Sequence, residues 1–316
     1  MNFKPIPEAD LIRTGIEIAT TIIDWGRLPL RRLIKQLSIR KVDYKDPNNV
    51  TRAFDASAHD YMVLTLRSRF DDQIMVYGEE ARSTPKSLVH TRPTVAVVDA
   101  LDGTDLVARG FSNWCCALAF IYPREQKILA TVVGHISGDI YYASDKGAFK
   151  RTYSLTRKLG SETRLKRNSD EDLKLEEASI CFYGQKPGNF LVVANDAIGL
   201  REKLQQFSDR IKGGESLPIR IYNFAGNPMM VKTSERTVDA VFELTGQKAH
   251  DVVPGAYIAT KAGAVFTDLE GKPIDPAAAL LNPNERLTYI LAATQSLAAE
   301  LKDALAKRAK PTTQQA

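Results

Sequence analysis

Apolar positions in the first part of the chain follow two periods. Over residues 8–25 they recur every three or four positions, which predicts an amphipathic helix packed through one face. A more mixed pattern of the same period predicts a second helix over 56–69, after a polar, loop-like stretch at 41–49. Short apolar runs that stop at turn residues predict strands. These runs cover 74–77, 95–98, 115–122, 128–136 and 140–143.

The second part of the chain alternates in the same way. Apolar runs predict strands at 190–194, 238–244 and 264–267. Helical spacing predicts helices at 252–262 and 296–309. The whole chain therefore mixes helices with strands, and it contains no internal repeat or low-complexity segment.

A charged stretch separates the two parts. Residues 157–177 are rich in charge and nearly free of large apolar side chains, so we interpret them as an exposed connection between two lobes. The expected organisation is an N-terminal lobe over 1–156, this connection, a C-terminal lobe over 178–310 and a polar tail over 311–316. The basic residues that open the connection are interpreted as a solvated loop, because acidic residues follow at once.

Composition narrows the class of protein. The 316 residues are 44% hydrophobic and 26% charged, as in an ordinary globular chain, and the net charge of +5 is too small to indicate nucleic-acid binding. The three cysteines, Cys115, Cys116 and Cys181, do not form a disulfide framework. No apolar run reaches the length of about 20 residues that a membrane span needs. We expect a cytoplasmic protein with neither a membrane nor a nucleic acid as partner.

The segment 99–104, with the sequence DALDGT, follows a buried strand directly. Carboxylates at a strand end, such as Asp99 and Asp102, can converge on a hard divalent cation. Gly103 permits close approach of the backbone, and the start of a short helix offers N–H groups to an anion. The Thr104 hydroxyl can orient a water. A metal site beside a phosphate site is what metal-assisted hydrolysis of a phosphate ester requires.

Other interpretations of this segment stay open at this point. An Asp-Gly pair is often only a turn, and Asp or Thr is often only a helix cap. An EF-hand fits poorly because its glycine and final glutamate would fall at the wrong positions. Haloacid-dehalogenase phosphatases also place Asp and Asp-Gly-Thr after a strand, but their two aspartates are two residues apart, and here the spacing is three.

Two further acidic motifs accompany this segment. Glu79 and Glu80 end an earlier strand in the sequence GEE, and Asp251 lies in HDVVPG near the C-terminus. Together with DALDGT, in this order, the chain resembles the inositol monophosphatase superfamily, whose signatures are Gly-Glu-Glu, Asp-Pro-x-Asp-Gly-Thr/Ser and Trp-Asp-x-Ala-x-Gly. Similarities at 110–111, 138–149 and 262–273 extend the resemblance over roughly residues 10–300.

The resemblance implies a fold and a set of roles. The fold would be α+β, a layered αβαβα sandwich of the sugar-phosphatase type. Two to three Mg²⁺ ions would bind. The first would be held by Glu79, Asp99 and the Leu101 carbonyl, the second by Asp99, Asp102 and Asp251, and a third by Glu79 through water. Gly103 and Thr104 would receive the substrate phosphate, and Thr104 would position the attacking water.

Some positions depart from the family pattern. Asp55 is the candidate for the aspartate that hydrogen-bonds the catalytic threonine, although its spacing is one residue too long; a cap of the helix expected from Ala56 is the alternative. Glu243 is the candidate acceptor of a substrate hydroxyl, but lies eight residues before Asp251 where seven is usual. Ala100 replaces a proline, His250 replaces a tryptophan and is expected to pack, and 224–227 stands in place of a Gly-Ser-Ala segment.

The implied function is Mg²⁺-dependent hydrolysis of a small phosphate monoester, of the inositol or sugar phosphate class, with sensitivity to lithium. A 3′-phosphonucleotide, fructose-1,6-bisphosphate or histidinol phosphate are alternatives within the family. A non-catalytic homologue that binds a phosphate ligand is the alternative from another class. A homodimer is implied as a possible assembly. Cys115, Cys116 and Trp114 are expected in the core, and no chemistry is assigned to His59, His90 or His135.

Overall fold

The computed structural model describes residues 5–28, 47–78, 93–153, 159–167 and 170–307. The expectations for several residues and segments lie outside this part of the chain, namely those for Glu79, Glu80, His90, 41–46 and the tail 311–316. Among the helices that are described, none is both long and apolar enough to cross a membrane.

Seven strands form the larger sheet, sheet A, and lie side by side in chain order. The first two run parallel and all other neighbours are antiparallel. The strands are β1 (Ile74–Gly78), β2 (Thr94–Asp102), β3 (Cys115–Tyr122), β4 (Lys127–His135), β5 (Asp139–Ser144), β6 (Gly147–Tyr153) and β7 (Leu159–Leu165). Because β1 and β2 are parallel, their carboxyl ends lie at the same edge of the sheet, with Gly78 opposite Val98.

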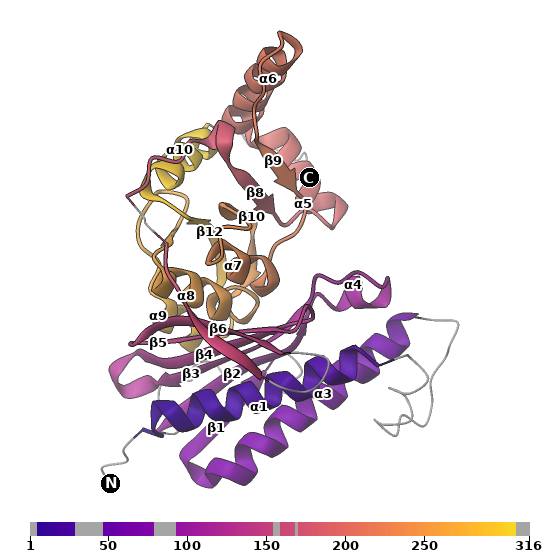
Figure 1. The fold of residues 1–316 in the computed structure, drawn as a ribbon, viewed down its shortest axis with the longest axis vertical. Helices are drawn as coiled ribbons and strands as arrows, with labels where there is room; N and C mark the ends of the chain where they lie inside the picture. The colour runs from indigo at the N-terminus through magenta and orange to yellow at the C-terminus, as the bar shows by residue number, and fades with distance from the viewer. Residues whose placement is uncertain (1–4, 29–46, 79–92, 154–158, 168–169, 308–316) are drawn as a thin grey trace, which may run out of the picture.

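Both faces of sheet A are covered, which explains why its central strands are almost continuously apolar. Helices α1 (Glu8–Gly26) and α3 (Pro47–Phe70) pack on one face, as Figure 1 shows. Side chains alternate between the faces, so the neighbours Cys115 and Cys116 of β3 belong to two different cores. All three cysteines are buried and form no disulfide.

Five strands form the smaller sheet, sheet B, in the order β11-β12-β10-β8-β9. Their bounds are β8 (Ser179–Phe182), β9 (Arg220–Tyr222), β10 (Ala240–Lys248), β11 (Val265–Thr267) and β12 (Arg286–Ala292). Short one-turn elements occur at η1 (Asp71–Gln73), η2 (Pro123–Glu125), η3 (Leu175–Glu177), η4 (Val192–Asp196) and η5 (Ala249–Asp251).

Two further layers of helices complete the molecule. The central layer packs between the sheets and consists of α7 (Asn227–Thr233), α8 (Val253–Ala262) and α9 (Pro276–Leu281). The outer layer packs on the far face of sheet B and contains α6 (Ile198–Lys212) and α10 (Gln295–Ala306). The order of layers is thus helix, sheet, helix, sheet, helix (Figure 1). This confirms the expected αβαβα sandwich.

Several expected elements are confirmed and one is wrong. The helices expected at 8–25, 252–262 and 296–309 correspond to α1, α8 and α10. The strand expected at 190–194 is absent: α5 (Pro187–Leu191) and η4 occupy this stretch. Pro187 fits the first turn of a helix, where its missing N–H is not needed. Phe190 is 47% exposed, so the apolar run does not mark a buried strand.

The charged stretch is more structured than an exposed loop. Residues 159–165 form β7, which pairs with β6 at the edge of sheet A, and 160–164 are exposed. Arg167, counted among the loop residues, is only 8% exposed. Its guanidinium donates to the carbonyl of Thr233 at 2.6 Å and pairs with Asp239 at 3.0 Å. The end of the stretch is therefore anchored to the second lobe.

Candidate functional site

The end of β2 bends into the site through an extra residue. Pairing with β3 passes from Asp99 opposite Ala117 to Asp102 opposite Cys115, so β2 contains one residue more than its partner over this stretch. Such bulges re-aim side chains and are common beside active sites. Asp99 is 4% exposed and its Oδ1 accepts the Leu101 amide at 3.2 Å. The strand end therefore presents a buried carboxylate held by its own backbone.

Gly103 and Thr104 turn the chain from β2 into the short helix α4 (Thr104–Ala108). Gly103 has φ 97°, and a Cβ there would lie 3.1 Å from the Asn113 carbonyl oxygen and from Trp114 Cβ. A side chain here would be strained in conformation and tightly packed, so the position favours glycine. The Thr104 hydroxyl donates to the Leu101 carbonyl at 3.0 Å. Its remaining lone pairs are available to accept a hydrogen bond.

Asp102 is linked directly to the second lobe. Its Oδ2 accepts the backbone amide of Asn227, the first residue of α7, at 2.7 Å. The preceding residue, Gly226, has φ 80°, and a Cβ there would lie 2.9 Å from the Asp102 carboxylate. Glycine is therefore required for α7 to approach this carboxylate. The segment 224–227, which departs from the family pattern, thus contacts a predicted metal ligand.

The Asn227 side chain extends this link to Asp251. Its Nδ2 donates to the His250 carbonyl at 2.8 Å, and its Oδ1 accepts the Gly255 amide at 2.8 Å. Both bonds are buried, and they fix η5 and the start of α8 on either side of Asp251. The His250 ring is 3% exposed, and its Nε2 lies 3.0 Å from Asp251 Oδ1. His250 therefore packs against the aspartate beside it.

The end of β2, the start of α4 and Asp251 line one cavity of about 300 Å³. The predicted site residues that the structure brings together there are Asp99, Leu101, Asp102, Gly103, Thr104 and Asp251. The cavity is also lined by residues that the sequence did not indicate, including Asn113, Tyr183, Gln185, Lys186 and Gln247. Side chains from the end of β2 and from η5 thus meet at one cavity.

The carboxylates raise the pKa of neighbouring groups. Burial and the charges of Asp105, Asp251 and Asp102 raise the pKa of Tyr183 to about 12. Burial, followed by the charges of Asp102 and Asp99, raises the pKa of the Cys115 thiol. Each shift has a contribution from negative charge around the cavity. A bound cation would compensate this charge.

The donor set suits a divalent cation. Carboxylates and a backbone carbonyl are the oxygen ligands that a hard cation prefers. Among the described residues, no three His, Cys, Asp or Glu side chains are already arranged as a metal-binding group. The donors of this part of the chain therefore share the cavity without forming a complete coordination sphere, and Glu79 lies outside the described residues.

Two predicted residues lie outside the cavity lining. Glu243 is 2% exposed, its carboxylate accepts the Thr245 amide at 2.6 Å, and burial raises its pKa. Asp55 lies well inside α3, so the alternative that it caps a helix beginning at Ala56 is wrong. Helix α3 packs against α4, the helix that begins with Thr104.

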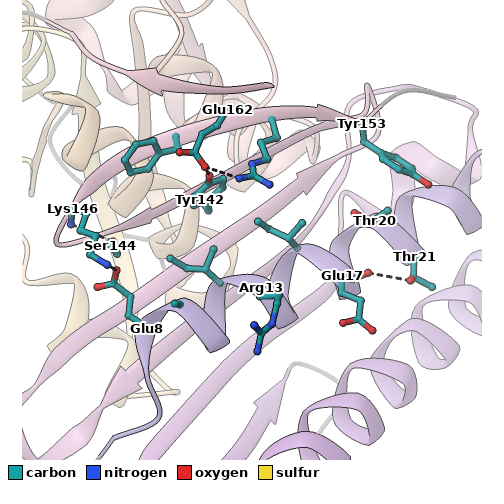
Figure 2. Close-up of a pocket in the computed structure, with 15 residues that line it drawn as sticks. Glu8, Arg13, Glu17, Thr20, Thr21, Tyr142, Ser144, Lys146, Tyr153 and Glu162 are labelled. Carbon is teal, nitrogen blue, oxygen red and sulfur yellow. Dashed lines mark hydrogen bonds and ion pairs between the residues drawn. The ribbon is translucent and has the colours of Figure 1, made fainter. Parts of the chain in front are cut away.

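A second, larger cavity lies away from these carboxylates. It measures about 690 Å³ and runs between α1 and the face of β5 and β6, as Figure 2 shows. Its acidic members engage neighbours: Glu162 accepts Arg151 at 3.0 Å and Glu8 pairs with Lys146 at 3.3 Å. No aspartate lines it. It does not supply the converging oxygen donors found at the end of β2.

Comparisons with known proteins identify the family and the fold of the chain. A model of the inositol monophosphatase family matches residues 16–310. No curated protein sequence matches the chain. Solved structures with a similar fold include inositol monophosphatase-II of Staphylococcus aureus, with 19% identity, 92% of each chain covered and a TM-score of 0.62. Two structures of SaIMPase-II are bound to 2′AMP and to inositol monophosphate.

Two further structures extend the comparison. The extragenic suppressor protein SuhB of Bartonella henselae has 18% identity, covers 94% of this chain and 99% of its own, and gives a TM-score of 0.64. The IMPase of Thermotoga maritima has 18% identity, covers 94% and 97%, and gives a TM-score of 0.61. These likenesses show the fold. Because the family match spans most of its length, the chain belongs to the inositol monophosphatase family of phosphoric monoester hydrolases, which use divalent metal ions.

Proposed function

We propose that this enzyme hydrolyses a small phosphate monoester, of the inositol or sugar phosphate class, with Mg²⁺. The observation that carries the proposal is the convergence of Asp99, Asp102, Thr104 and Asp251 on one cavity from two lobes. A cavity of about 300 Å³ is at the small end of ligand sites and favours a small ester. The SaIMPase-II structures with 2′AMP and inositol monophosphate are consistent with such a ligand.

The proposed metal ligands are those of the family pattern. Asp99, the Leu101 carbonyl and Glu79 would hold one ion, and Asp99, Asp102 and Asp251 a second, with a third near Glu79 through water. Glu79 follows Gly78, which ends β1 opposite Val98, the residue before Asp99. Bound divalent ions would supply a nucleophilic water and neutralise charge on phosphate and leaving group.

The chain's own groups would position the reacting atoms. The Thr104 hydroxyl donates its proton to the Leu101 carbonyl, so towards the cavity it acts as an acceptor. An attacking water that donates to Thr104 would have a lone pair left for phosphorus. The amides of Gly103 and Thr104 would receive phosphate oxygens at the start of α4. Because the Thr104 proton is donated to Leu101, Asp55 would support Thr104 through the packing of α3 against α4. Glu243 would accept a substrate hydroxyl.

Phosphate release tests this function. The panel comprises inositol-1-phosphate, fructose-1,6-bisphosphate, 3′-phosphoadenosine-5′-phosphate and histidinol phosphate, each with Mg²⁺ and with chelator. Mg²⁺-dependent release from one of them would support the reaction and identify the substrate class. Silence from a folded protein that binds Mg²⁺ and phosphate would instead favour the non-catalytic binder. We further expect millimolar lithium to inhibit, light scattering to give the mass of a homodimer, and cell fractionation to place the protein in the cytoplasm.

A further inference from the structure

The two walls of the cavity differ in chemistry. One wall carries Asp99 and Asp102 from β2 of sheet A and Thr104 from α4. A second wall carries Tyr183, Gln185 and Lys186, from the segment that follows β8. Among the described residues that line the cavity, Lys186 is the only one with a positive charge. This second wall consists of donors that the carboxylates of the first wall do not use.

The segment that carries Lys186 is anchored to the fold. Asn223 Nδ2 donates to the Gly184 carbonyl at 2.9 Å. A Cβ at Gly184 would lie 2.3 Å from the Phe182 ring and 2.5 Å from Asn223 Oδ1, so the chain is tightly packed here. Lys186 precedes α5, and its carbonyl accepts the Phe190 amide at 3.0 Å. The backbone that presents the lysine is therefore held in place from both sides.

The side chains on this wall have no protein partner. Within the described part of the chain, the Lys186 ammonium, the Tyr183 hydroxyl and the Gln185 amide form no hydrogen bond or ion pair. Burial and the nearby carboxylates raise the pKa of Tyr183 to about 12, so its hydroxyl remains a donor at neutral pH. An unpaired ammonium and an unpaired phenol that line the same cavity suit an anionic acceptor.

The scissile phosphate does not fill this role. In the proposed function, that phosphate is held at the other wall, by the metal ions and by the amides of Gly103 and Thr104. Lys186 is exposed, so beside a neutral remainder of the substrate its charge would face only water. Resting on the proposed function, we propose that the substrate is a small phosphate monoester that carries a second anionic group, a carboxylate or a phosphate, bound by Lys186 with Tyr183.

Matched pairs of esters test this inference. Glycerol 3-phosphate is compared with 3-phosphoglycerate, which adds a carboxylate, and glucose 1-phosphate with glucose 1,6-bisphosphate, which adds a phosphate. In at least one pair, we expect the unaltered enzyme to prefer the ester with the second anionic group about ten-fold in kcat/KM, mainly through a lower KM. A hydrogen bond to a charged group at a partly solvated site is worth about this factor. The pair that shows the preference tells which anion is bound.

Variants assign the preference to the lysine. We expect Lys186→Gln to bring the ratio of kcat/KM between the two members of a pair close to one, and Lys186→Arg to keep most of that ratio. Lys212→Gln removes the same charge from the exposed end of α6 and should change nothing. The preference should also shrink as salt is raised, because salt screens exposed charges.

The outcomes separate the two proposals. Equal turnover of both members of each pair, or a preference that survives in Lys186→Gln, would overturn the second anion site and leave the phosphatase proposal standing. Failure of the unaltered enzyme to hydrolyse any ester of these pairs or of the first panel would overturn both. A preference lost in Lys186→Gln and kept in Lys212→Gln would establish the site.

Discussion

The backbone amide of Asn227 donates a 2.7 Å hydrogen bond to Oδ2 of Asp102. This bond joins the start of α7 to the end of β2, across 125 residues of sequence. The Asn227 side chain then bonds the His250 carbonyl and the Gly255 amide. Two aspartates from different lobes, Asp102 and Asp251, are therefore positioned through one asparagine, which is a structural role that a list of metal ligands omits.

Asn227→Ala tests this role. The substitution keeps the backbone bond to Asp102 but leaves the buried His250 carbonyl and Gly255 amide without their partner. Leaving buried polar groups unsatisfied costs about 1–3 kcal/mol each, so we expect a loss of about 2–6 kcal/mol in the free energy of unfolding and weaker Mg²⁺ activation. Asn227→Asp keeps the acceptor for Gly255 but places an oxygen against the His250 carbonyl, so it should be destabilised as well. Urea unfolding of the three proteins would contradict this role if all were equally stable.

Gly226→Ala tests the close approach of α7 to Asp102. The new Cβ would lie 2.9 Å from the carboxylate, at a residue with φ 80°. We expect lower stability together with a higher Mg²⁺ concentration for half-maximal activity. Gly214→Ala is the matched control, because Gly214 has φ 99° and nothing within 4 Å of the added Cβ. Backbone strain costs about 1–2 kcal/mol at either position, but only Gly226→Ala should change the response to Mg²⁺. An equal response in both variants would contradict the prediction.

Asp99→Asn tests the proposed metal site. The amide keeps the shape of a side chain that is 4% exposed but removes its charge. We expect kcat to fall by at least ~10³ while the fold remains intact, because the metal-dependent step loses a ligand shared by two ions. Mg²⁺ should raise the melting temperature of the unaltered protein, by linkage of binding to folding, and raise that of the variant much less.

The exposed Asp60→Asn substitution on α3 is the control for the loss of one carboxylate. It should retain both turnover and stabilisation by Mg²⁺. Near-normal turnover in Asp99→Asn would refute the assigned role of this residue. A trapped aspartyl-phosphate at Asp99 would support covalent catalysis instead.

His135 makes stability depend on pH. Burial and the charge of Lys232 lower the pKa of His135 to about 4, although the charges of Asp139 and Glu235 act to raise it. Between about pH 6.5 and 4 the unfolded chain therefore binds the proton more readily than the folded one. Stability should fall as pH is lowered through this window, by as much as about 3 kcal/mol.

His135→Asn removes the titration and retains an acceptor for the Ser137 amide, which donates to His135 Nδ1 at 3.1 Å. The difference in unfolding free energy between the two proteins should therefore change with pH between 6.5 and 4, and stay constant above pH 7. A constant difference over the whole range would contradict the prediction.

Elements with a strong period were predictable from the sequence. The helix at 8–25 buries one face, and β3 is apolar throughout because it is covered on both sides. Where exposure decides the structure, the pattern fails: the apolar side chains of Phe190 and Leu191 are 47% and 53% exposed on a short helix. Helix α3 begins at Pro47, and this early start was not predicted because the first turns of the helix are polar. Neither α6 nor β12 was predicted from the sequence.

Only part of the candidate site was predictable from the sequence. Asp99, Asp102, Gly103 and Thr104 were identifiable because their chemistry lies within six consecutive residues. Asn227 and Lys186 carry no local motif, and they become significant only when α7 and the segment after β8 meet the end of β2. For Asn227 the sequence held one indirect signal, the departure of the segment 224–227 from the family pattern. This segment contains the residue whose amide bonds Asp102.

Strand β7 has a consequence for how copies of this protein can associate. It is the last strand of sheet A within the described residues, and no other described strand pairs with the backbone groups on its outer side. An open edge of this kind can recruit a strand from another molecule unless its side chains discourage it. Residues 160–164 are exposed and include Glu162 and Arg164. Charged side chains on such an edge discourage strand pairing between molecules, so the proposed homodimer would form through packed side chains on another surface.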